Sequence, residues 1–218
     1  PVAFYGYDTL GVDPKDCPVI VSIAAFFWGA YLGDNAIMNG ASVKISDWKR
    51  FDSSSFPVSA KASGQYMNSM LAVQDARSSG YDEAILLNQE GYVAEGSGQN
   101  IFFIKDGEVY TNDYKSSILM GITRDSILSF LPSINIDYNI VKISIDDLFN
   151  ADEIFFCGTA SEITPVVKID NKPIGSGEAG EITLSLKKHY LDIVYGKNNL
   201  YLDWLTNIKL PNQISPQK

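Results

Sequence analysis

Lys61-Ala-Ser-Gly-Gln-Tyr66-Met-Asn-Ser-Met70 places a lysine just ahead of a predicted helix. Ser63 is a candidate N-cap, because a serine hydroxyl can accept a hydrogen bond from a free N–H of the first helical turn. Tyr66 and Met70 then fall on one helical face, and Gly80 ends the helix. A lysine in such a position is most often a solvated surface charge, so its meaning depends on the rest of the chain.

The remaining pattern predicts a mixed α+β fold with many hairpins rather than a series of βαβ units. The apolar run 19–27 predicts a buried strand, and residues 29–40, which hold three glycines, predict a linker or loop. Further strands are expected at 1–6, 83–87, 92–95, 139–144 and 153–157, hairpins at 100–110 about Asp106-Gly107 and at 166–174 about Asp170-Asn171, and helices at 123–131, 146–150 and 181–195.

Composition is that of an ordinary globular protein, with 45% hydrophobic and 20% charged residues among 218. The length predicts one or two domains. A net charge of -9 argues against a nucleic-acid partner, because phosphate binding needs clustered Lys and Arg. The longest apolar run, 19–30, is shorter than the roughly 20 residues that span a bilayer. No signal peptide is predicted. Because the chain opens on Pro1 rather than Met, we expect a processed or truncated piece.

Cysteine and histidine are scarce. Cys17 and Cys157 lack metal-ligand spacing, which predicts neither a zinc site nor a disulfide and favours a reduced, cytoplasmic compartment. His189 is the only histidine, and the charged residues beside it predict a solvated surface position. A histidine-based triad is therefore disfavoured. Any catalysis must come from lysine, carboxylates, tyrosine or a cofactor.

Three other segments carry unusual chemistry, although each alone is a weak signal. They are Glu95-Gly-Ser-Gly98-Gln-Asn100, Met120-Gly-Ile-Thr-Arg124 at a predicted helix N-terminus, and Cys157-Gly-Thr-Ala160. Together with Lys61 and Tyr66 of the stretch quoted at the start, these segments supply an amine, a carboxylate, a phenol and two anion-binding turns. Pyridoxal phosphate requires this set: an amine for its aldehyde, a carboxylate for its ring nitrogen, and N–H and hydroxyl donors for its phosphate.

The sequence resembles the class IV aminotransferases, which are fold-type IV pyridoxal phosphate enzymes, and most of all the branched-chain amino acid aminotransferases. Phe27-Trp-Gly-Ala-Tyr31-Leu favours this branch over the D-amino acid aminotransferase and aminodeoxychorismate lyase branches. The other matching segments are Lys61-x-x-Gly-x-Tyr66, Gly80-Tyr-Asp-Glu83, Gly91-Tyr-Val-Ala-Glu95-Gly-Ser-Gly-Gln-Asn100, Gly121-Ile-Thr-Arg124 and Gly158-Thr-Ala-Ser-Glu-Ile-Thr-Pro165.

The resemblance implies roles for individual residues. Lys61 would be the Schiff-base lysine and proton shuttle, a buried amine that faces Glu95 across the cofactor ring. Glu95 would pair with the pyridine nitrogen, and Tyr66 would hydrogen-bond the phenolic oxygen. The remaining implied contacts are the backbone amides of Ile122 and Thr123 and the hydroxyl of Thr159 on the phosphate, the N–H groups of Thr159 and Ala160 on the substrate carboxylate, Trp28 and Tyr31 in the pocket wall, and Val12 in the site of a partner subunit of a homodimer.

The resemblance also implies a domain division. Residues 1–28 would be the C-terminal remnant of a small domain, 29–40 an interdomain loop, and 41–218 a large cofactor domain with a β-barrel-like core and surrounding helices. Relatives have a complete small domain, which carries an arginine for the phosphate and a Tyr-x-Arg pair near the substrate carboxylate. None of the three arginines, Arg50, Arg77 and Arg124, matches those roles. Gln99 stands where many relatives carry glutamate.

The implied activity is ping-pong transamination of leucine, isoleucine or valine with 2-oxoglutarate. Two alternatives share the fold: a D-amino acid aminotransferase and an aminodeoxychorismate lyase-like enzyme. A third is a non-catalytic fragment that folds but turns over poorly.

Overall fold

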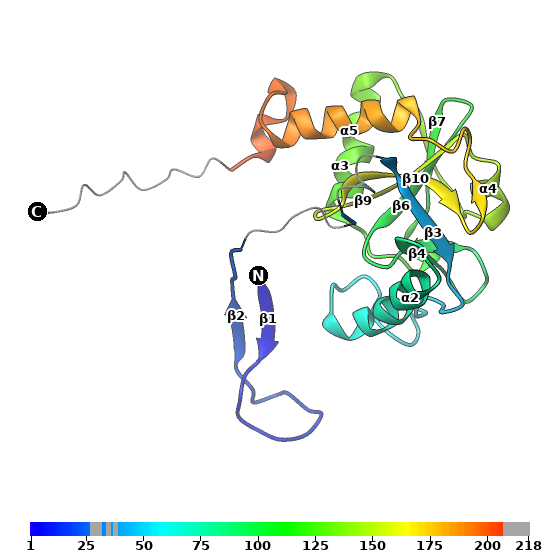
Figure 1. Ribbon diagram of the computed structural model, residues 1–218. Helices are drawn as coiled ribbons and strands as arrows, with labels where there is room; N and C mark the ends of the chain where they lie inside the picture. Colours follow the sequence, from blue (N-terminus) through cyan, green and yellow to red (C-terminus); the bar gives the residue numbers. More distant parts are fainter. Residues whose placement is uncertain (27–31, 34–35, 37–38, 207–218) are drawn as a thin grey trace, which may run out of the picture.

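The computed structural model describes residues 1–26, 32–33, 36 and 39–206. It contains two separate sheets (Figure 1). The smaller sheet is an antiparallel hairpin of β1 (Val2–Tyr5) and β2 (Val19–Ser22). The larger sheet has nine strands and carries the helices. No helix among the described residues is long and apolar enough to cross a membrane.

The large sheet has the strand order β5-β4-β3-β10-β9-β6-β7-β8, with β11 paired to β10. Parallel pairs join β3 to β4, β3 to β10 and β7 to β8, and the other pairs are antiparallel. The strands are β3 (Ala41–Ile45), β4 (Glu83–Leu87), β5 (Val93–Gly96), β6 (Asn100–Lys105), β7 (Glu108–Thr111), β8 (Tyr138–Ile140), β9 (Glu153–Gly158), β10 (Glu162–Ile169) and β11 (Lys172–Pro173).

A short turn curls this sheet toward closure. It joins β5, at one end of the strand order, to β6 near the middle, and the Gly96 N–H donates to the Gln99 carbonyl across it at 2.8 Å. Because β5 must therefore lie beside β6, the strands between them bend into a ring. The α+β prediction with a β-barrel-like core is confirmed.

Two apolar cores lie on opposite faces of the curled sheet, because successive side chains of a strand point to opposite sides. In β6, Ile101 and Phe103 belong to one core, whereas Phe102 and Ile104 belong to the other. The second core also takes apolar side chains from α3 (Ile122–Phe130) and α5 (Glu181–Val194), which cover that face (Figure 1).

Other helices lie at the edges of this arrangement. α2 (Tyr66–Ser78) packs on β4 through Ala72 and Ala76, and α4 (Ile145–Phe149) begins with a capping box made by Ser144 and Asp147. Short 3-10 helices occupy Ser63–Gln65, Tyr114–Ser116, Leu131–Ile134 and Asn199–Trp204. The predicted helices at 123–131, 146–150 and 181–195 are thus confirmed within one or two residues at each end.

The sharp turns also follow the sequence. Asp106 and Gly107 both take positive φ, 51° and 83°, between β6 and β7, as a tight hairpin requires. Gly80, with φ of 86°, follows α2 as its C-terminal stop.

The prediction of a buried strand at 19–27 was wrong. β2 covers only Val19–Ser22, and all four residues are exposed, with Val19 at 67% and Val21 at 64%. Within the part of the chain that the structure describes, β2 pairs only with β1 in the separate hairpin, so no second layer buries its side chains. The domain division at 1–28, 29–40 and 41–218 remains a prediction, because much of 27–38 lies outside the described residues.

Two further expectations need correction. Ser63 is no N-cap of α2, because it opens a 3-10 turn that delays the helix to Tyr66 and no side chain caps that end. His189 is half-buried rather than a fully solvated surface residue. Its ring lies 4.9 Å from that of Phe130, its Nε2 is buried without a hydrogen-bond partner among the described residues, and burial lowers its pKa.

Candidate functional site

A cavity of about 380 Å³ opens where four segments of the large sheet and its helices meet. Its walls come from residues within 50–66, 95–100, 119–123 and 157–159. These are the turn before α2, the connection between β5 and β6, the start of α3 and the end of β9. The volume lies in the range of small-molecule sites.

Most of the predicted site residues meet in this cavity. Those that line it are Lys61, Tyr66, Glu95, Ile122, Thr123 and Thr159. Ala160 does not line it, although it follows Thr159 directly. Val12 is fully exposed in the loop between β1 and β2. Trp28 and Tyr31 lie outside the described residues.

The amine of Lys61 lies against the aromatic ring of Tyr66, with Nζ 5.9 Å from the ring centroid. Tyr66 is held as the first residue of α2. Lys61 itself is exposed, so the expectation of a buried amine was wrong. The physical reason is its position ahead of the 3-10 turn Ser63–Gln65, where it packs into none of the apolar clusters of the described residues.

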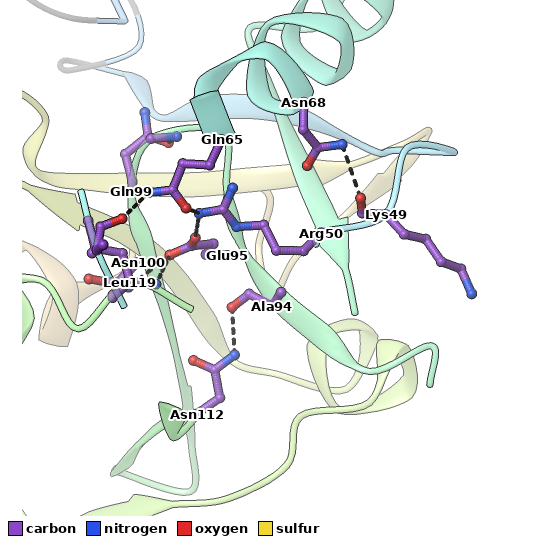
Figure 2. Close-up of polar contacts among 12 residues, drawn as sticks. Lys49, Arg50, Gln65, Asn68, Ala94, Glu95, Gln99, Asn100, Asn112 and Leu119 are labelled. Carbon is purple, nitrogen blue, oxygen red and sulfur yellow. Dashed lines mark hydrogen bonds and ion pairs between the residues drawn. The ribbon is translucent and has the colours of Figure 1, made fainter. Parts of the chain in front are cut away.

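Glu95 is the buried anion of the site, with an exposed fraction of 4%. It lies on β5, opposite Leu86 of β4. Oε2 accepts hydrogen bonds from the Leu119 N–H at 3.1 Å and from Asn100 Nδ2 at 3.3 Å. Oε1 lies 2.6 Å from Nη2 of Arg50, as Figure 2 shows.

The charge of Glu95 is finely balanced. Burial raises the pKa of Glu95 to about 7, because a charged carboxylate loses its hydration there. The positive charge of Arg50 is the largest influence in the opposite direction, followed by the hydrogen bond from Leu119. The carboxylate therefore changes its charge near neutral pH, and Arg50 is the main group that keeps it ionised.

Arg50 is the residue that sequence reasoning missed. It is 4% exposed, lines the cavity, and also donates from Nη2 to Oε1 of Gln65 at 2.9 Å. The sequence signal for it was weak: arginine is rare in this chain, and Arg50 lies eleven positions before Lys61 in a segment without periodicity.

The start of α3 offers backbone donors to the cavity. Gly121 is the N-cap and has no side chain to satisfy the first N–H groups of the helix, which belong to Ile122 and Thr123. The dipole of the helix adds positive potential at the same end. Among the described residues that line the cavity, only Arg50 and Lys61 carry a positive charge. An anion at α3 would thus depend on N–H and hydroxyl donors.

A second buried carboxylate holds the turn between β5 and β6. Glu83 is completely buried, and its Oε2 accepts from Oγ of Ser97 at 2.9 Å and from Nε2 of Gln99 at 3.2 Å. Burial raises the pKa of Glu83. The departure at Gln99 has a local explanation, because an amide donates to Glu83 where a glutamate would place a second negative charge beside it.

Known proteins provide an independent comparison. The chain matches the family described as amino-transferase class IV over residues 3–169. It is similar to the branched-chain-amino-acid aminotransferase of Pseudomonas aeruginosa, with 44% identity over 209 residues, which cover 96% of this chain and 68% of that protein. The chain spans about two thirds of the length of the curated relatives that it matches, for example 66% of the probable branched-chain-amino-acid aminotransferase of Aquifex aeolicus.

Solved structures show the same fold. The crystal structure of the branched-chain aminotransferase from Thermoproteus uzoniensis with norvaline aligns with a TM-score of 0.88 at 40% identity, over 94% of this chain and 66% of that one. The PLP-form (holo-form) of the branched-chain amino acid aminotransferase from Thermobaculum terrenum aligns with a TM-score of 0.74 at 38% identity, over 76% of this chain and 54% of that one. The fold-type IV prediction is confirmed.

Proposed function

Because this chain belongs to the class IV aminotransferases and is similar to their branched-chain members, we propose that it transaminates leucine, isoleucine or valine with 2-oxoglutarate, using pyridoxal 5'-phosphate. One observation carries the proposal. The amine of Lys61, the buried carboxylate of Glu95 and the uncapped start of α3 line a single cavity. Together they match an aldehyde, a ring nitrogen and a phosphate.

The residues present fit the cofactor. Glu95 lines the cavity, and contacts with Arg50 and Leu119 hold both of its carboxylate oxygens in place. Gly121 brings the α3 backbone close to Asn100, and a Cβ there would overlap Oδ1 of Asn100. The backbone N–H groups of Ile122 and Thr123, with the hydroxyl of Thr159, would hold the phosphate.

Pyridoxal phosphate, when bound, supplies an aldehyde for an amine and a ring that accepts electrons from the substrate α-carbon. Lys61 would hold the cofactor through its amine, which condenses with an aldehyde and releases water, and the same amine, once displaced by the substrate amine, would carry the proton of the substrate α-carbon. Glu95 would hold a positive charge on the ring nitrogen. Tyr66 would donate a hydrogen bond to the phenolic oxygen, which orients the ring.

Substrate contacts extend the proposal. The N–H groups of Thr159 and Ala160 would bind the substrate carboxylate, and Trp28 and Tyr31 would line the side-chain pocket. Val12 would reach the site of a partner subunit in a homodimer. The exposed apolar side chains of the β1–β2 hairpin support a covered surface there. Two free cysteines support a cytoplasmic location.

The test is a coupled transaminase assay with each of leucine, isoleucine and valine as donor and 2-oxoglutarate as acceptor. We expect turnover of the L-amino acids and parallel double-reciprocal lines, which indicate a ping-pong mechanism. D-alanine as the better donor would instead support the D-amino acid aminotransferase reading. Pyruvate release from aminodeoxychorismate would support the lyase reading. An adduct on Lys61 without turnover would support the non-catalytic fragment. The observation that favours it is that, among the described residues, Arg124 of α3 donates to the Asn112 carbonyl and does not line the cavity.

Substitution of Gly121 by alanine tests the phosphate end. The added methyl group would displace Asn100, which donates to Glu95 and to the Leu119 carbonyl, so we expect pyridoxal phosphate to bind about tenfold more weakly. Gly64→Ala is the matched control, because its Cβ would meet only Phe56 at an ordinary 3.5 Å. Fluorescence titration with the cofactor gives both dissociation constants. Equal values for Gly121→Ala and Gly64→Ala would contradict the placement of the cofactor between Glu95 and the start of α3.

A further inference from the structure

Arg50 is a buried cation whose bonding is concentrated on one nitrogen. Nη2 contacts both Oε1 of Glu95 and Oε1 of Gln65, whereas Nε and Nη1 are buried without a hydrogen-bond partner among the described residues. An arginine kept only to tie the fold together would be expected to use most of its five donors. A buried ion pair of this kind contributes little net stability to a fold, so stability alone does not account for Arg50.

Gln65 links this pair to the lysine. It is 1% exposed and lies in the 3-10 turn that leads into α2. Its Oε1 accepts from Arg50, and its Nε2 donates to the carbonyl of Ala60 at 2.7 Å. Ala60 directly precedes Lys61. Figure 2 shows Gln65 in contact with Arg50, and Arg50 in contact with Glu95. Through its second contact, with Ala60, the Gln65 side chain connects the backbone beside the amine to the cation beside the carboxylate.

The backbone of Arg50 is fixed independently of these contacts. Its N–H donates to the Leu87 carbonyl at 2.7 Å, and its carbonyl accepts from Nε2 of Gln89 at 2.9 Å. The side chain is therefore not needed to hold the backbone in place, and its role depends on the guanidinium group at its tip. There it places a permanent positive charge against a carboxylate that burial tends to neutralise.

We propose that Arg50 and Gln65 are positioning residues, with Arg50 favouring the negatively charged form of Glu95 through their direct contact and Gln65 fixing Arg50 relative to the backbone that carries Lys61. The proposal rests on the proposed function for its catalytic consequence. A neutral Glu95 could not hold a positive charge on the ring nitrogen, and the ring would then be a poorer electron acceptor. The hold of Arg50 on Glu95 exists with or without the cofactor.

The first experiment therefore uses the protein without added cofactor. Carbon-13 NMR of labelled glutamate follows the titration of the Glu95 carboxyl, assigned by loss of its signal in Glu95→Gln. We expect Arg50→Met to raise the titration midpoint by about one pH unit or more, and Arg50→Lys, which keeps the charge, to stay closer to wild type. Gln65→Met should fall between them. If Arg50→Met fails to fold, Gln65→Met and Arg50→Lys carry the same test.

Asn68→Leu is the matched control. Asn68 is also a buried amide of this region, and its Nδ2 donates to the Lys49 carbonyl at 3.0 Å (Figure 2). Among the described residues, its side chain lies outside the cavity and is not hydrogen-bonded to Arg50 or Glu95. Its loss should lower stability and leave the Glu95 titration in place. A titration equally shifted in Asn68→Leu, or unshifted in Arg50→Met and Gln65→Met, would overturn the proposal.

The second readout uses the loaded enzyme. We expect kcat of Gln65→Met to fall about tenfold with little change in KM, and its acidic pH limit to move upward with the NMR midpoint. Failure of the proposed function is distinguishable. It would show as wild-type protein that forms no Lys61-dependent adduct, while the NMR titration would still report whether Arg50 controls Glu95.

Discussion

Substitution of Lys61 by alanine is expected to abolish transamination, with a loss of about 10³-fold or more in kcat. Lys61 is the only lysine among the described residues that line the cavity, and the proposed reaction needs its amine both as the nucleophile toward the aldehyde and as the carrier of the α-proton. Loss of either role alone removes orders of magnitude of rate. Steady-state assays measure the rate. Mass spectrometry after borohydride reduction shows whether the cofactor becomes attached to residue 61.

Lys49→Ala is the control for this change. Lys49 is an exposed lysine on the same approach to α2, and its Nζ donates to the Gln89 carbonyl at 3.2 Å, outside the cavity. It should retain both the rate and the reducible adduct. A Lys61→Ala protein that still acquired a reduced adduct and turned over leucine would assign the chemistry to a different amine.

The second large effect is expected at Glu95, where activity and stability should move in opposite directions. Glu95→Gln cannot hold a positive charge on the ring nitrogen, so we expect kcat to fall about 10²-fold or more. The fold should survive, because glutamine keeps the acceptor for Leu119 and resembles the protonated acid. Glu153→Gln is the control: Glu153 accepts from the N–H groups of Ile182 and Thr183 at α5, away from the cavity, and its loss should leave kcat unchanged.

The direction in which Glu95 changes stability with pH follows from the direction of its pKa shift. Because the pKa of Glu95 rises from 4.5 to about 7 on folding, the folded protein keeps a proton that the unfolded chain has already lost. The contribution of Glu95 to stability is thus full at low pH and is lost as the pH rises through about 7. Between pH 5 and pH 8, we expect the unfolding free energy of Glu95→Gln to gain about 2 kcal/mol relative to wild type. Urea denaturation of both cofactor-free proteins at the two pH values measures it, and a constant difference would contradict the raised pKa.

Local signals predicted much of the fold. The strand at Glu83–Leu87 and the hairpin at Asp106-Gly107 follow from an apolar run bounded by turn residues and from positive φ, which act within a few positions. The prediction of a buried strand at 19–27 was wrong for a non-local reason. An apolar run says that a strand can be buried, but whether another layer covers it depends on tertiary neighbours, and β2 has only β1.

The residues of the site also divide into those that a short segment of sequence predicts and those that only the folded chain brings together. Lys61, Glu95 and Thr123 could be predicted, because each stands in a short segment whose spacing carries the chemistry. Arg50 could not, because its contact with Glu95 joins residues 45 positions apart and exists only through the folding of the chain around β4 and β5. The exposure of Lys61 was also beyond the sequence, since spacing does not say which side of a cavity stays open.

Small side chains on α2 allow this helix to pack closely on β4, at a distance from the cavity. Ala72 and Ala76 are completely buried against Ala84 and Leu86 of β4, so the helix contributes two methyl groups to this apolar cluster. Lys61 enters the cavity on the turn before that helix, whereas Glu95 lies on the strand beside β4. A bulkier residue at position 72 or 76, both outside the cavity, is therefore expected to shift α2 on β4 and to change the reach from amine to carboxylate. Directed evolution toward other amino donors would then change the geometry of the site through the packing of α2 on β4, while every cavity residue stays the same.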